Sequence, residues 1–457
     1  EPLDVLALER THAFKGRSLA VVRPASTTEV SAILSLASET KTPVVPQSGN
    51  TGLAGGAYAG DGETAILMSL ERMNRIRSIN TRSRLATVEA GVILANLHEA
   101  AEAQGLVFPL MFGARGSCMI GGNLATNAGG SNVVRYGNMR ALCAGLEVVM
   151  PDGEIVNLMS ELLKDNTGYD LRDLFIGAEG TLGVITGAVL RLFPKPSAYA
   201  TAMIAVPSLS GALGLLNLLQ RETGGAVEAF EYMPREYFRH LKSLRPESHL
   251  PFAEIPETSI LVEIAATSQA EADPDEVGRI PLVARLEALL SGLLEEGKIL
   301  DATLARNEAQ RREMWTQREL AFEVTMSRGI PITADVSVPL DRVGDFLADA
   351  GERLATIAPQ AEILAIAHLG DGNLHYSLWP NPDSTAAPDA AMKTRVFEAV
   401  EDVVARLGGS FSAEHGIGVS KLGSMQRRKD AGALAIMKKI KHALDPEDIM
   451  NPGKLLP

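Results

Sequence analysis

Cysteine is scarce in this chain, with only two residues among 457. Cys118 and Cys143 do not form a metal-binding or redox motif. Their small number excludes a framework of disulfide bonds. We therefore expect a protein from a reducing compartment.

Basic residues are also in short supply, because 43 Lys and Arg face 56 Asp and Glu and give a formal net charge of −13. Non-specific binding to nucleic acid or to anionic membranes needs exposed basic surface, so this balance argues against both. No apolar run approaches the roughly 20 residues that span a bilayer. We expect a cytoplasmic protein of bacterial type, with peripheral membrane association as the alternative. The chain opens at Glu1 rather than Met, which leaves open a removed tag or organelle leader.

Two common nucleotide-binding motifs are missing from the loop at residues 47–56, which follows a predicted strand at 43–46. The loop has neither the G-x-G-x-x-G of a dinucleotide fold nor the Lys-Ser/Thr of a Walker A loop, so nicotinamide and ATP sites are disfavoured. Its closely spaced glycines nevertheless allow backbone N–H groups to converge on a phosphate. Taken alone, a flexible surface turn explains this loop equally well.

Two further Gly-rich segments follow, at residues 113–131 and 177–186. The first is too apolar for a disordered linker. A strand at 19–22, a helix at 28–38 and a hairpin at 146–157 place all three segments in one α/β region. Together they indicate one extended cofactor that carries phosphate.

Histidine is sparse, but three of the eight histidines lie in the segments 368–375 and 414–415. We predict a hairpin with strands at 363–367 and 374–378, in which His368 and His375 lie about 5 Å apart. Glu414 would complete a site of two histidines and one carboxylate, which suits Zn, Mn or Fe(II). The alternative is a polar hairpin beside an unrelated Glu-His pair.

The length of the chain exceeds one typical core and predicts two or three domains. The character of the sequence changes after Pro194 and Pro196. Beyond this boundary we predict an α+β domain with an exposed acidic loop at 271–276. Its expected elements are strands at 202–206 and 259–265, and helices at 209–219, 282–295, 307–324, 340–350 and 390–406.

Taken in order, these motifs resemble the FAD-binding domain of flavoproteins of the vanillyl-alcohol-oxidase type. The segments 368–375, 412–418 and 451–454 narrow the resemblance to the FAD-dependent D-2-hydroxyacid dehydrogenases, which include D-2-hydroxyglutarate and D-lactate dehydrogenases. It covers about residues 20–457, and its specificity lies in the order and spacing of the motifs. It implies an α+β fold in which a two-subdomain FAD-binding domain (1–195) precedes an α+β substrate domain (196–409). Residues 410–457 would return to the flavin domain.

The resemblance also implies which residues bind FAD. The first two Gly-rich segments would hold the pyrophosphate and the isoalloxazine edge, and the third would support the adenine side. The first loop lacks the His or Cys to which some relatives attach the flavin, so we expect FAD to be bound non-covalently. The predicted cofactor-binding residues are Pro46, Gln47, Ser48, Gly49, Asn50, Thr51, Gly55, Gly113, Ser117, Gly121, Gly122, Asn123, Thr126, Gly129, Gly130, Glu179, Gly180, Gly183, Ile185 and Asn451.

Catalytic roles follow from the same resemblance. A divalent ion, zinc first with manganese or iron as alternatives, would bind the substrate through the site at His368, His375 and Glu414. His415 would be the general base, the alternative being a histidine that orients its neighbours.

Two more residues are expected at the substrate. Arg318 matches the arginine that clamps a substrate carboxylate, whereas without the resemblance it would be an exposed helical arginine paired with a Glu. Asn373 could donate a hydrogen bond to substrate or ligand, or could simply form the turn.

Two positions depart from the D-2-hydroxyglutarate type. Phe322 stands where such enzymes carry a Thr, and Thr333 where they carry a Lys. A second substrate carboxylate buried there would lack charge compensation, which costs several kcal/mol. We therefore favour an apolar monocarboxylic D-2-hydroxy acid, such as D-lactate or D-mandelate, over D-2-hydroxyglutarate.

Other classes of function stay open. A non-redox enzyme resembling alkylglycerone-phosphate synthases would show a His-rich run near 415, but here only His415 is present. A flavin-free metallohydrolase and an inactive binding or electron-relay protein are further alternatives. The electron acceptor would be electron-transfer flavoprotein, a quinone or a cytochrome, and analogy with relatives suggests a homodimer.

Overall fold

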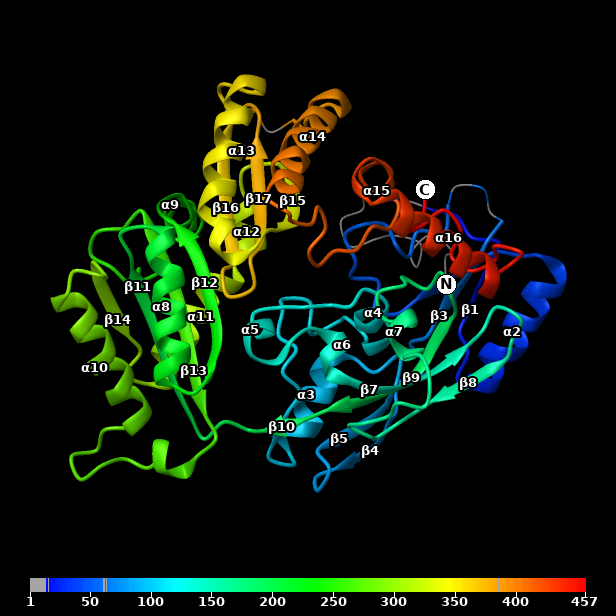
Figure 1. Cartoon of the computed structure of the whole chain (residues 1–457), viewed down its shortest axis with the longest axis horizontal. Helices are drawn as coiled ribbons and strands as arrows, with labels where there is room; N and C mark the ends of the chain where they lie inside the picture. Colours follow the sequence, from blue (N-terminus) through cyan, green and yellow to red (C-terminus); the bar gives the residue numbers. More distant parts are fainter. Residues whose placement is uncertain (1–13, 15, 61, 63, 385) are drawn as a thin grey trace. The chain divides into compact units, whose positions relative to one another are not determined.

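The structure, a computed structural model, describes residues 14, 16–60, 62, 64–384 and 386–457. The chain divides into two compact units. The first holds the N-terminal part up to Gly129, residues 137–195 and Glu414–Pro457, drawn mainly in blue, cyan and red in Figure 1. The second holds Gly130–Tyr136 and Pro196–Ala413. The predicted domain boundaries at 195/196 and 409/410 lie beside these divisions, but the sequence did not indicate the transfer of 130–136 to the second unit.

A small parallel sheet opens the first unit. Strands β1 (Ala20–Val22) and β2 (Val44–Gln47) both pair with β3 (Ile66–Ser69), and helix α2 (Thr27–Thr40) connects β1 to β2. Ser26 caps α2, because its hydroxyl accepts a hydrogen bond from the backbone N–H of Glu29. The predicted helix at 28–38 is therefore confirmed, with about one more turn in all.

A five-stranded antiparallel sheet forms the rest of the framework of this unit, in the order β4-β5-β9-β7-β8. The predicted hairpin at 146–157 is confirmed as its β7–β8 pair. The strands are β4 (Ile76–Asn80), β5 (Leu85–Glu89), β7 (Cys143–Val149), β8 (Ile155–Leu158) and β9 (Val184–Arg191). The other elements are α3 (Leu94–Glu102), β6 (Leu106–Val107), α4 (Ile120–Ala125), α6 (Met139–Leu142), α7 (Arg172–Phe175), β10 (Phe193–Pro194), α15 (Leu422–Arg428) and α16 (Ala431–Leu444).

The second unit is built on a seven-stranded sheet in the order β14-β11-β13-β12-β16-β17-β15, in which all the neighbouring strands are antiparallel. Its strands are β11 (Ala198–Ala205), β12 (Val227–Pro234), β13 (Thr258–Ala266), β14 (Asp301–Leu304), β15 (Ile332–Ser337), β16 (Glu362–His368) and β17 (Asn373–Trp379). The strands predicted at 259–265, 363–367 and 374–378 are confirmed.

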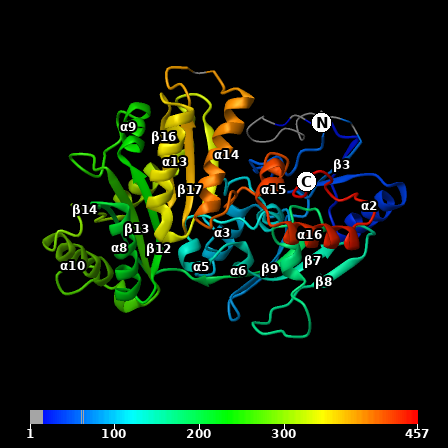
Figure 2. The same cartoon turned by 45° about the horizontal axis from the view of Figure 1, so that its top comes forward.

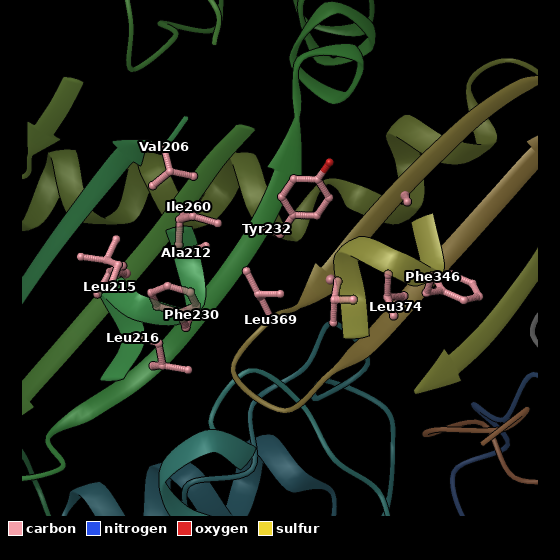
Figure 3. Close-up of a cluster of buried hydrophobic side chains, with 14 of the residues drawn as sticks. Val206, Ala212, Leu215, Leu216, Phe230, Tyr232, Ile260, Phe346, Leu369 and Leu374 are labelled. Atoms are coloured by element: carbon pink, nitrogen blue, oxygen red, sulfur yellow. The ribbon is translucent and has the colours of Figure 1, made fainter. Parts of the chain in front are cut away.

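Helices cover both faces of this sheet. Helices α8 (Leu209–Glu222), α10 (Pro281–Glu295), α13 (Val343–Ile357) and α14 (Ala390–Arg406) bury the main apolar core on one face, and Figure 2 shows α13 and α14 alongside β16 and β17. Figure 3 shows part of this core, with Leu215 and Leu216 of α8 beside Phe230 of β12. Helices α9 (Arg235–Leu244), α11 (Glu308–Glu319) and α12 (Ala321–Met326) build a second cluster with the other face. The shorter α5 (Val133–Tyr136), η1 (Gln269–Glu271) and η2 (Leu340–Arg342) complete the unit.

The helix predicted at 307–324 is interrupted in the structure. Residues 307–324 form two helices rather than one, because Leu320 has a ψ of 2°, far from the helical value. Met314, Ala321 and Val324 on either side of the break pack into the same apolar cluster. Their spacing therefore keeps a helical pattern across the break, and only tertiary packing reveals it.

The sequence predicts neither a disulfide framework nor a membrane-spanning segment, and the described residues bear on both expectations. Cys118 and Cys143 are both buried and form no disulfide. Among the described helices, none combines the length and the apolar character needed to cross a bilayer.

The apolar face of α10 provides a test of the packing in the second unit. Leu290 is 2% exposed and Leu294, one turn later, is 47% exposed. We expect Leu290→Ala to lower the free energy of unfolding by about 2–5 kcal/mol, because it leaves a cavity in the core. Leu294→Ala should change it by about 0.5 kcal/mol or less. Urea denaturation followed by circular dichroism measures both, and equal effects would contradict this packing.

Candidate active site

The hairpin of β16 and β17 carries the two predicted histidine ligands. Gly372 in its turn has a φ of +80°, and a Cβ atom there would lie 2.2 Å from the carbonyl oxygen of Val338. Only glycine fits this position, because any side chain would meet both the strained dihedral and the close backbone. The turn at 369–372 is thus fixed by its sequence, and the strands leave it in a defined register.

That register places both imidazoles on one face of the sheet. His368 pairs with Asn373, and Ile366 pairs with His375, so the two histidines are diagonal neighbours. Their ring centroids lie 5.3 Å apart and the ring planes are nearly perpendicular, at 83°. The predicted proximity of His368 and His375 is therefore present in the structure.

A carboxylate lies behind each imidazole. Glu231 stands opposite His368 on β12, and its oxygens lie 2.9 Å from the Nδ1 atom of His368. Asp335 stands opposite His375 on β15, with a carboxylate oxygen 3.9 Å from Nδ1 of His375. Asn373 donates a hydrogen bond of 2.9 Å from Nδ2 to Asp335. Nδ1 of His368 thus lies at hydrogen-bond distance from a carboxylate, which leaves Nε2 of that ring as the nitrogen suited to a ligand, whereas the 3.9 Å between the Asp335 oxygen and Nδ1 of His375 is too long for a hydrogen bond.

A group of possible metal ligands includes two residues that were predicted as such. Asp335, His375, Glu414 and His415 each offer one ligand atom, and these atoms lie within 4.8 Å of one another. Glu414 and His415 directly follow Ala413, whose backbone N–H donates to the carbonyl oxygen of Asp335 at 3.3 Å. His368 is not one of these four residues. Two carboxylates and two imidazoles in so small a space form a donor set that fits a divalent cation such as zinc.

Arg318 contacts Glu231 in this structure. Its Nε and Nη2 atoms lie 2.8 and 2.7 Å from the same carboxylate oxygen, and both side chains are buried. Burial acts to raise the pKa of Glu231, but the charges and hydrogen bonds of His368 and Arg318 outweigh it and lower the pKa. The carboxylate is therefore ionised at neutral pH.

The two predicted specificity positions are both exposed, so the expected burial of a second substrate carboxylate beside them is not seen. Phe322 on α12 is 53% exposed, and Thr333 on β15 is also exposed. Thr333 on β15 pairs with Ser377 on β17, and their hydroxyl oxygens are 3.2 Å apart. Side chains two residues apart on a strand share a face, so Thr333 lies on the same face of β15 as Asp335.

The segments predicted to bind flavin lie in the first unit, apart from Gly130, which belongs to the second. The loop after β2 lies against the start of α4, since a Cβ atom on Gly122 would lie 2.4 Å from the carbonyl oxygen of Ser48. A Cβ atom on Gly180 would likewise lie 2.7 Å from a ring carbon of Pro46. These two glycines therefore allow three backbone segments to approach one another closely, as a cofactor held by main-chain groups requires.

Asn451 ties these segments to the C-terminal end of the chain. Its Nδ2 atom donates to the carbonyl oxygens of Gly56 and Glu179, at 2.9 and 2.7 Å. Its Oδ1 atom is buried and has no hydrogen-bond partner among the described residues. A buried acceptor of this kind fits a ligand that donates a hydrogen bond, as the flavin would.

The Glu179 side chain has a structural partner. It accepts hydrogen bonds from the backbone N–H groups of Ile417 and Gly418, at 2.7 and 2.8 Å. Burial raises the pKa of Glu179 in spite of these two donors. Its carboxylate thus holds the segment that follows His415, and its place beside the flavin stays a prediction.

Backbone strain accompanies several predicted cofactor residues. Asn50, Glu179 and Asn451 have positive φ values of 48°, 52° and 44°, which few residues other than glycine adopt. Such conformations persist where the surrounding structure enforces them, and they are frequent at ligand sites.

The other predicted flavin residues occupy loops and short elements. Gln47 and Asn123 are buried, whereas Gly113 and Ser117 are exposed. Gly183 packs against β7, because a Cβ atom there would lie 2.9 Å from the carbonyl oxygen of Val149. The remaining predicted positions lie in the loop after β2, in α4, in the segment after it and in β9: Gly49, Thr51, Gly55, Gly121, Thr126, Gly129, Gly130 and Ile185.

Comparison with known proteins identifies the family of this chain. Residues 18–159 match the family described as FAD binding domain, and residues 195–455 match FAD linked oxidases, C-terminal domain. D-2-hydroxyglutarate dehydrogenase of Xanthomonas citri pv. viticola is 38% identical, over 100% of this chain and 93% of the relative. The mitochondrial D-2-hydroxyglutarate dehydrogenase of Bos taurus is 36% identical, over 100% of this chain and 80% of the relative. The chain belongs to the FAD-dependent D-2-hydroxyacid dehydrogenases.

Solved structures agree on the fold of this dehydrogenase. A p-cresol methylhydroxylase matches with a TM-score of 0.74 at 15% identity, over 99% of this chain and 91% of that one. An alkyldihydroxyacetonephosphate synthase matches with a TM-score of 0.69 at 17% identity, over 94% and 76%. The predicted FAD-binding domain of vanillyl-alcohol-oxidase type is confirmed, and so is the FAD-dependent oxidation of a D-2-hydroxy acid.

Sequence reasoning missed two residues of this dehydrogenase. Glu231 and Asp335 lie beside the imidazoles, but neither was predicted as a site residue. A signal was present for Glu231, because it lies in β12, all but the last of whose residues are buried, between Phe230 and Tyr232. A carboxylate inside such a strand needs a buried partner, so its presence indicates one.

The close approach at Gly122 provides a test of the flavin segments. Gly122→Ala would force the new methyl group against the carbonyl of Ser48, and overpacking of this kind costs about 1–3 kcal/mol. We expect FAD retention to weaken by roughly 5- to 150-fold. Gly116→Ala is the matched control, since nothing lies within 4 Å of a Cβ atom there. Flavin absorbance after dialysis measures both, and unchanged retention in Gly122→Ala would argue against this placement.

Proposed function

We propose that this dehydrogenase oxidises an apolar monocarboxylic D-2-hydroxy acid, such as D-lactate or D-mandelate, at a centre that holds a divalent metal ion. The observation that carries the proposal is the pair of imidazoles on one sheet face, of which His368 has a carboxylate at Nδ1 and His375 belongs to a group of four possible metal ligands. His368, His375 and Glu414 would hold the ion, with zinc favoured and manganese or iron as alternatives.

The donor group supports His375 and Glu414 as ligands, with Asp335 and His415 as further donors. Asp335 and Glu414 belong to one group within 4.8 Å, and two carboxylates so close together repel each other unless a cation or a proton lies between them. The contact of His368 with Glu231 uses Nδ1 and turns Nε2 away from that carboxylate. Ligation by Nε2 of His368 is thus compatible with the hydrogen bonds of the structure.

The remaining chemistry follows from the residues in the group. Bound FAD supplies the hydride acceptor, and a bound divalent ion supplies a Lewis acid that favours the ionised substrate alcohol. His415 would take the hydroxyl proton, because imidazole is an effective base near neutral pH. Asn373 would hold Asp335 through its Nδ2 atom, which also donates to the carbonyl oxygen of Val336.

The substrate preference rests on the surface next to this group. Thr333 and Ser377 form the next pair on the same face of β15 and β17 after Asp335 and His375, two residues or about 7 Å along the strand. Both side chains are uncharged hydroxyls, and their oxygens lie 3.2 Å apart. A second substrate carboxylate there would meet hydroxyls instead of the ammonium group of a lysine. Thr333 is exposed, so the missing lysine removes one ion-pair partner of the dicarboxylic substrate, whereas a methyl or phenyl group needs no such partner.

D-2-hydroxyglutarate is the second candidate substrate. The relatives that match the whole chain are named D-2-hydroxyglutarate dehydrogenases. Their names favour a dicarboxylic substrate, and an arginine from elsewhere in the chain could replace the lysine. The two candidates differ in a single measurable property, the preferred side chain of the substrate.

Several finer features stay predictions. Electron-transfer flavoprotein, a quinone or a cytochrome would accept the electrons from the reduced flavin. A homodimer and a cytoplasmic location are proposed by analogy with bacterial relatives. FAD is proposed to be bound without a covalent link, because the loop at 47–56 has neither His nor Cys.

The substrate preference can be measured on the purified protein without knowing the acceptor. Under anaerobic conditions we expect D-lactate to bleach the flavin absorbance and L-lactate to leave it unchanged. D-2-hydroxyglutarate should bleach it more slowly than D-lactate at the same concentration. Faster bleaching by D-2-hydroxyglutarate than by D-lactate and D-mandelate would contradict the proposed preference and support the second candidate.

A substitution at Thr333 provides the control for this preference. Thr333→Lys supplies the ammonium group that D-2-hydroxyglutarate-type enzymes carry there, so the preference should shift toward the dicarboxylic substrate. Ser210, on the exposed start of α8, is a matched position for Ser210→Lys, which should leave the preference unchanged.

Removal of the metal tests the second part of the proposal. We expect dialysis against a chelator to abolish bleaching by D-lactate while the flavin remains bound, since flavin and metal use different residues. Adding Zn²⁺ or Mn²⁺ should restore bleaching in the wild type but not in Glu414→Gln, which lacks one proposed ligand. Full bleaching in chelator-treated protein whose metal content is verified as nil would exclude a required metal ion.

A further inference from the structure

Glu231 occupies an unusual position in the second unit. It lies in the middle of β12 with 0% of its surface exposed. Its neighbours Phe230 and Tyr232 point into the apolar core of Figure 3, so Glu231 points to the opposite face of the sheet. On that face it meets two partners from distant parts of the chain, His368 and Arg318.

The carboxylate of Glu231 contacts both of these partners. Arg318 reaches one carboxylate oxygen with Nε at 2.8 Å and Nη2 at 2.7 Å. Nδ1 of His368 lies 2.9 Å from the carboxylate. A carboxylate accepts hydrogen bonds and donates none, so the proton of a neutral His368 must reside on Nδ1.

We propose that Glu231 is a positioning residue that fixes the ring orientation and tautomer of His368, with Arg318 as the counter-charge that allows this carboxylate to be buried. This inference rests on the proposed metal centre. It assigns Arg318 a role at the metal ligand, in addition to the predicted role as a clamp for the substrate carboxylate.

The physical reason is the choice between the two nitrogens of an imidazole. Without an acceptor at Nδ1 the proton can move to Nε2, and the ring can turn about its side-chain bonds. A proton on Nε2 occupies the lone pair that a metal ion needs, and a turned ring points that lone pair away from the ion. An acceptor behind a ligating histidine prevents both, and its loss typically weakens metal binding by about 10- to 100-fold.

The same sheet contains a matched control. Glu263 on β13 is also buried and also pairs with an arginine of α11, because Arg311 donates from Nε and Nη2 at 2.7 Å each. Its other partners are Trp315 at 2.8 Å and Thr201 at 2.6 Å. Glu263 thus shares the burial and the ion pair of Glu231, but none of these three partners is a histidine.

The experiment measures zinc binding to the FAD-loaded protein after removal of its metal. Zinc content is determined at a series of buffered free Zn²⁺ concentrations, with flavin content and melting temperature recorded for each variant. We expect Glu231→Leu to bind zinc about 10- to 100-fold more weakly than the wild type with its FAD retained, because leucine, unlike glutamine, offers no acceptor to Nδ1 of His368. Glu263→Leu should bind zinc as the wild type does, even where its melting temperature falls.

A second variant keeps the test decisive if Glu231→Leu fails to fold. Glu231→Leu leaves Arg318 buried without a carboxylate, which is strongly destabilising, whereas the double variant Glu231→Leu/Arg318→Met leaves no unpaired charge. Weak zinc binding in the folded double variant supports the positioning role. Wild-type zinc affinity in the double variant, or in a folded Glu231→Leu, overturns it.

The outcome for the wild type separates this inference from the proposed function. If the wild type binds zinc no better than Glu414→Gln, the proposed metal centre is wrong and the role of Glu231 falls with it. If the wild type binds zinc and loss of Glu231 does not change the affinity, only the positioning role is wrong.

Discussion

The register of four strands, β12, β16, β17 and β15, is the constraint on which the candidate active site depends. It sets Glu231 opposite His368 and Asp335 opposite His375, all on one face. A slip of one residue in any of these strands would move its polar side chains to the apolar core on the other face. The apolar residues of the core and the polar residues of the site therefore enforce the same register, and Gly372 fixes the turn between the two central strands.

Helix α11 supplies the charge that this polar face requires. Arg311 and Arg318 are seven residues apart, which is about two helical turns, so both side chains leave the same side of the helix. One pairs with Glu263 on β13 and the other with Glu231 on β12. Each buried carboxylate is thereby matched by one guanidinium. Without the helix, two buried charges would lack compensation, and folding of the second unit would be unfavourable.

The flavin segments of the first unit are organised by a different principle. There the backbone provides the contacts, and small residues permit the close approach of the loop after β2 to α4. Asn451 completes the arrangement from the end of the chain by bonding two carbonyl oxygens. A site that uses main-chain groups depends on local conformation and on glycine. A site that uses side-chain charges, as in the second unit, depends on pairing between distant residues.

This difference explains what the sequence determined by itself and what only the tertiary structure decided. Glycine spacing, turn residues and hydrophobic periodicity are local, so they predicted the Gly-rich segments, the hairpin of His368 and His375, and helix α14. The break at Leu320 and the ion pair between Glu231 and Arg318 both depend on packing between elements. Neither the break nor the choice of partner leaves a local pattern in the sequence. A glutamate inside an apolar segment indicated a buried partner for Glu231, but only the register of strands far apart in the chain showed that this partner is His368.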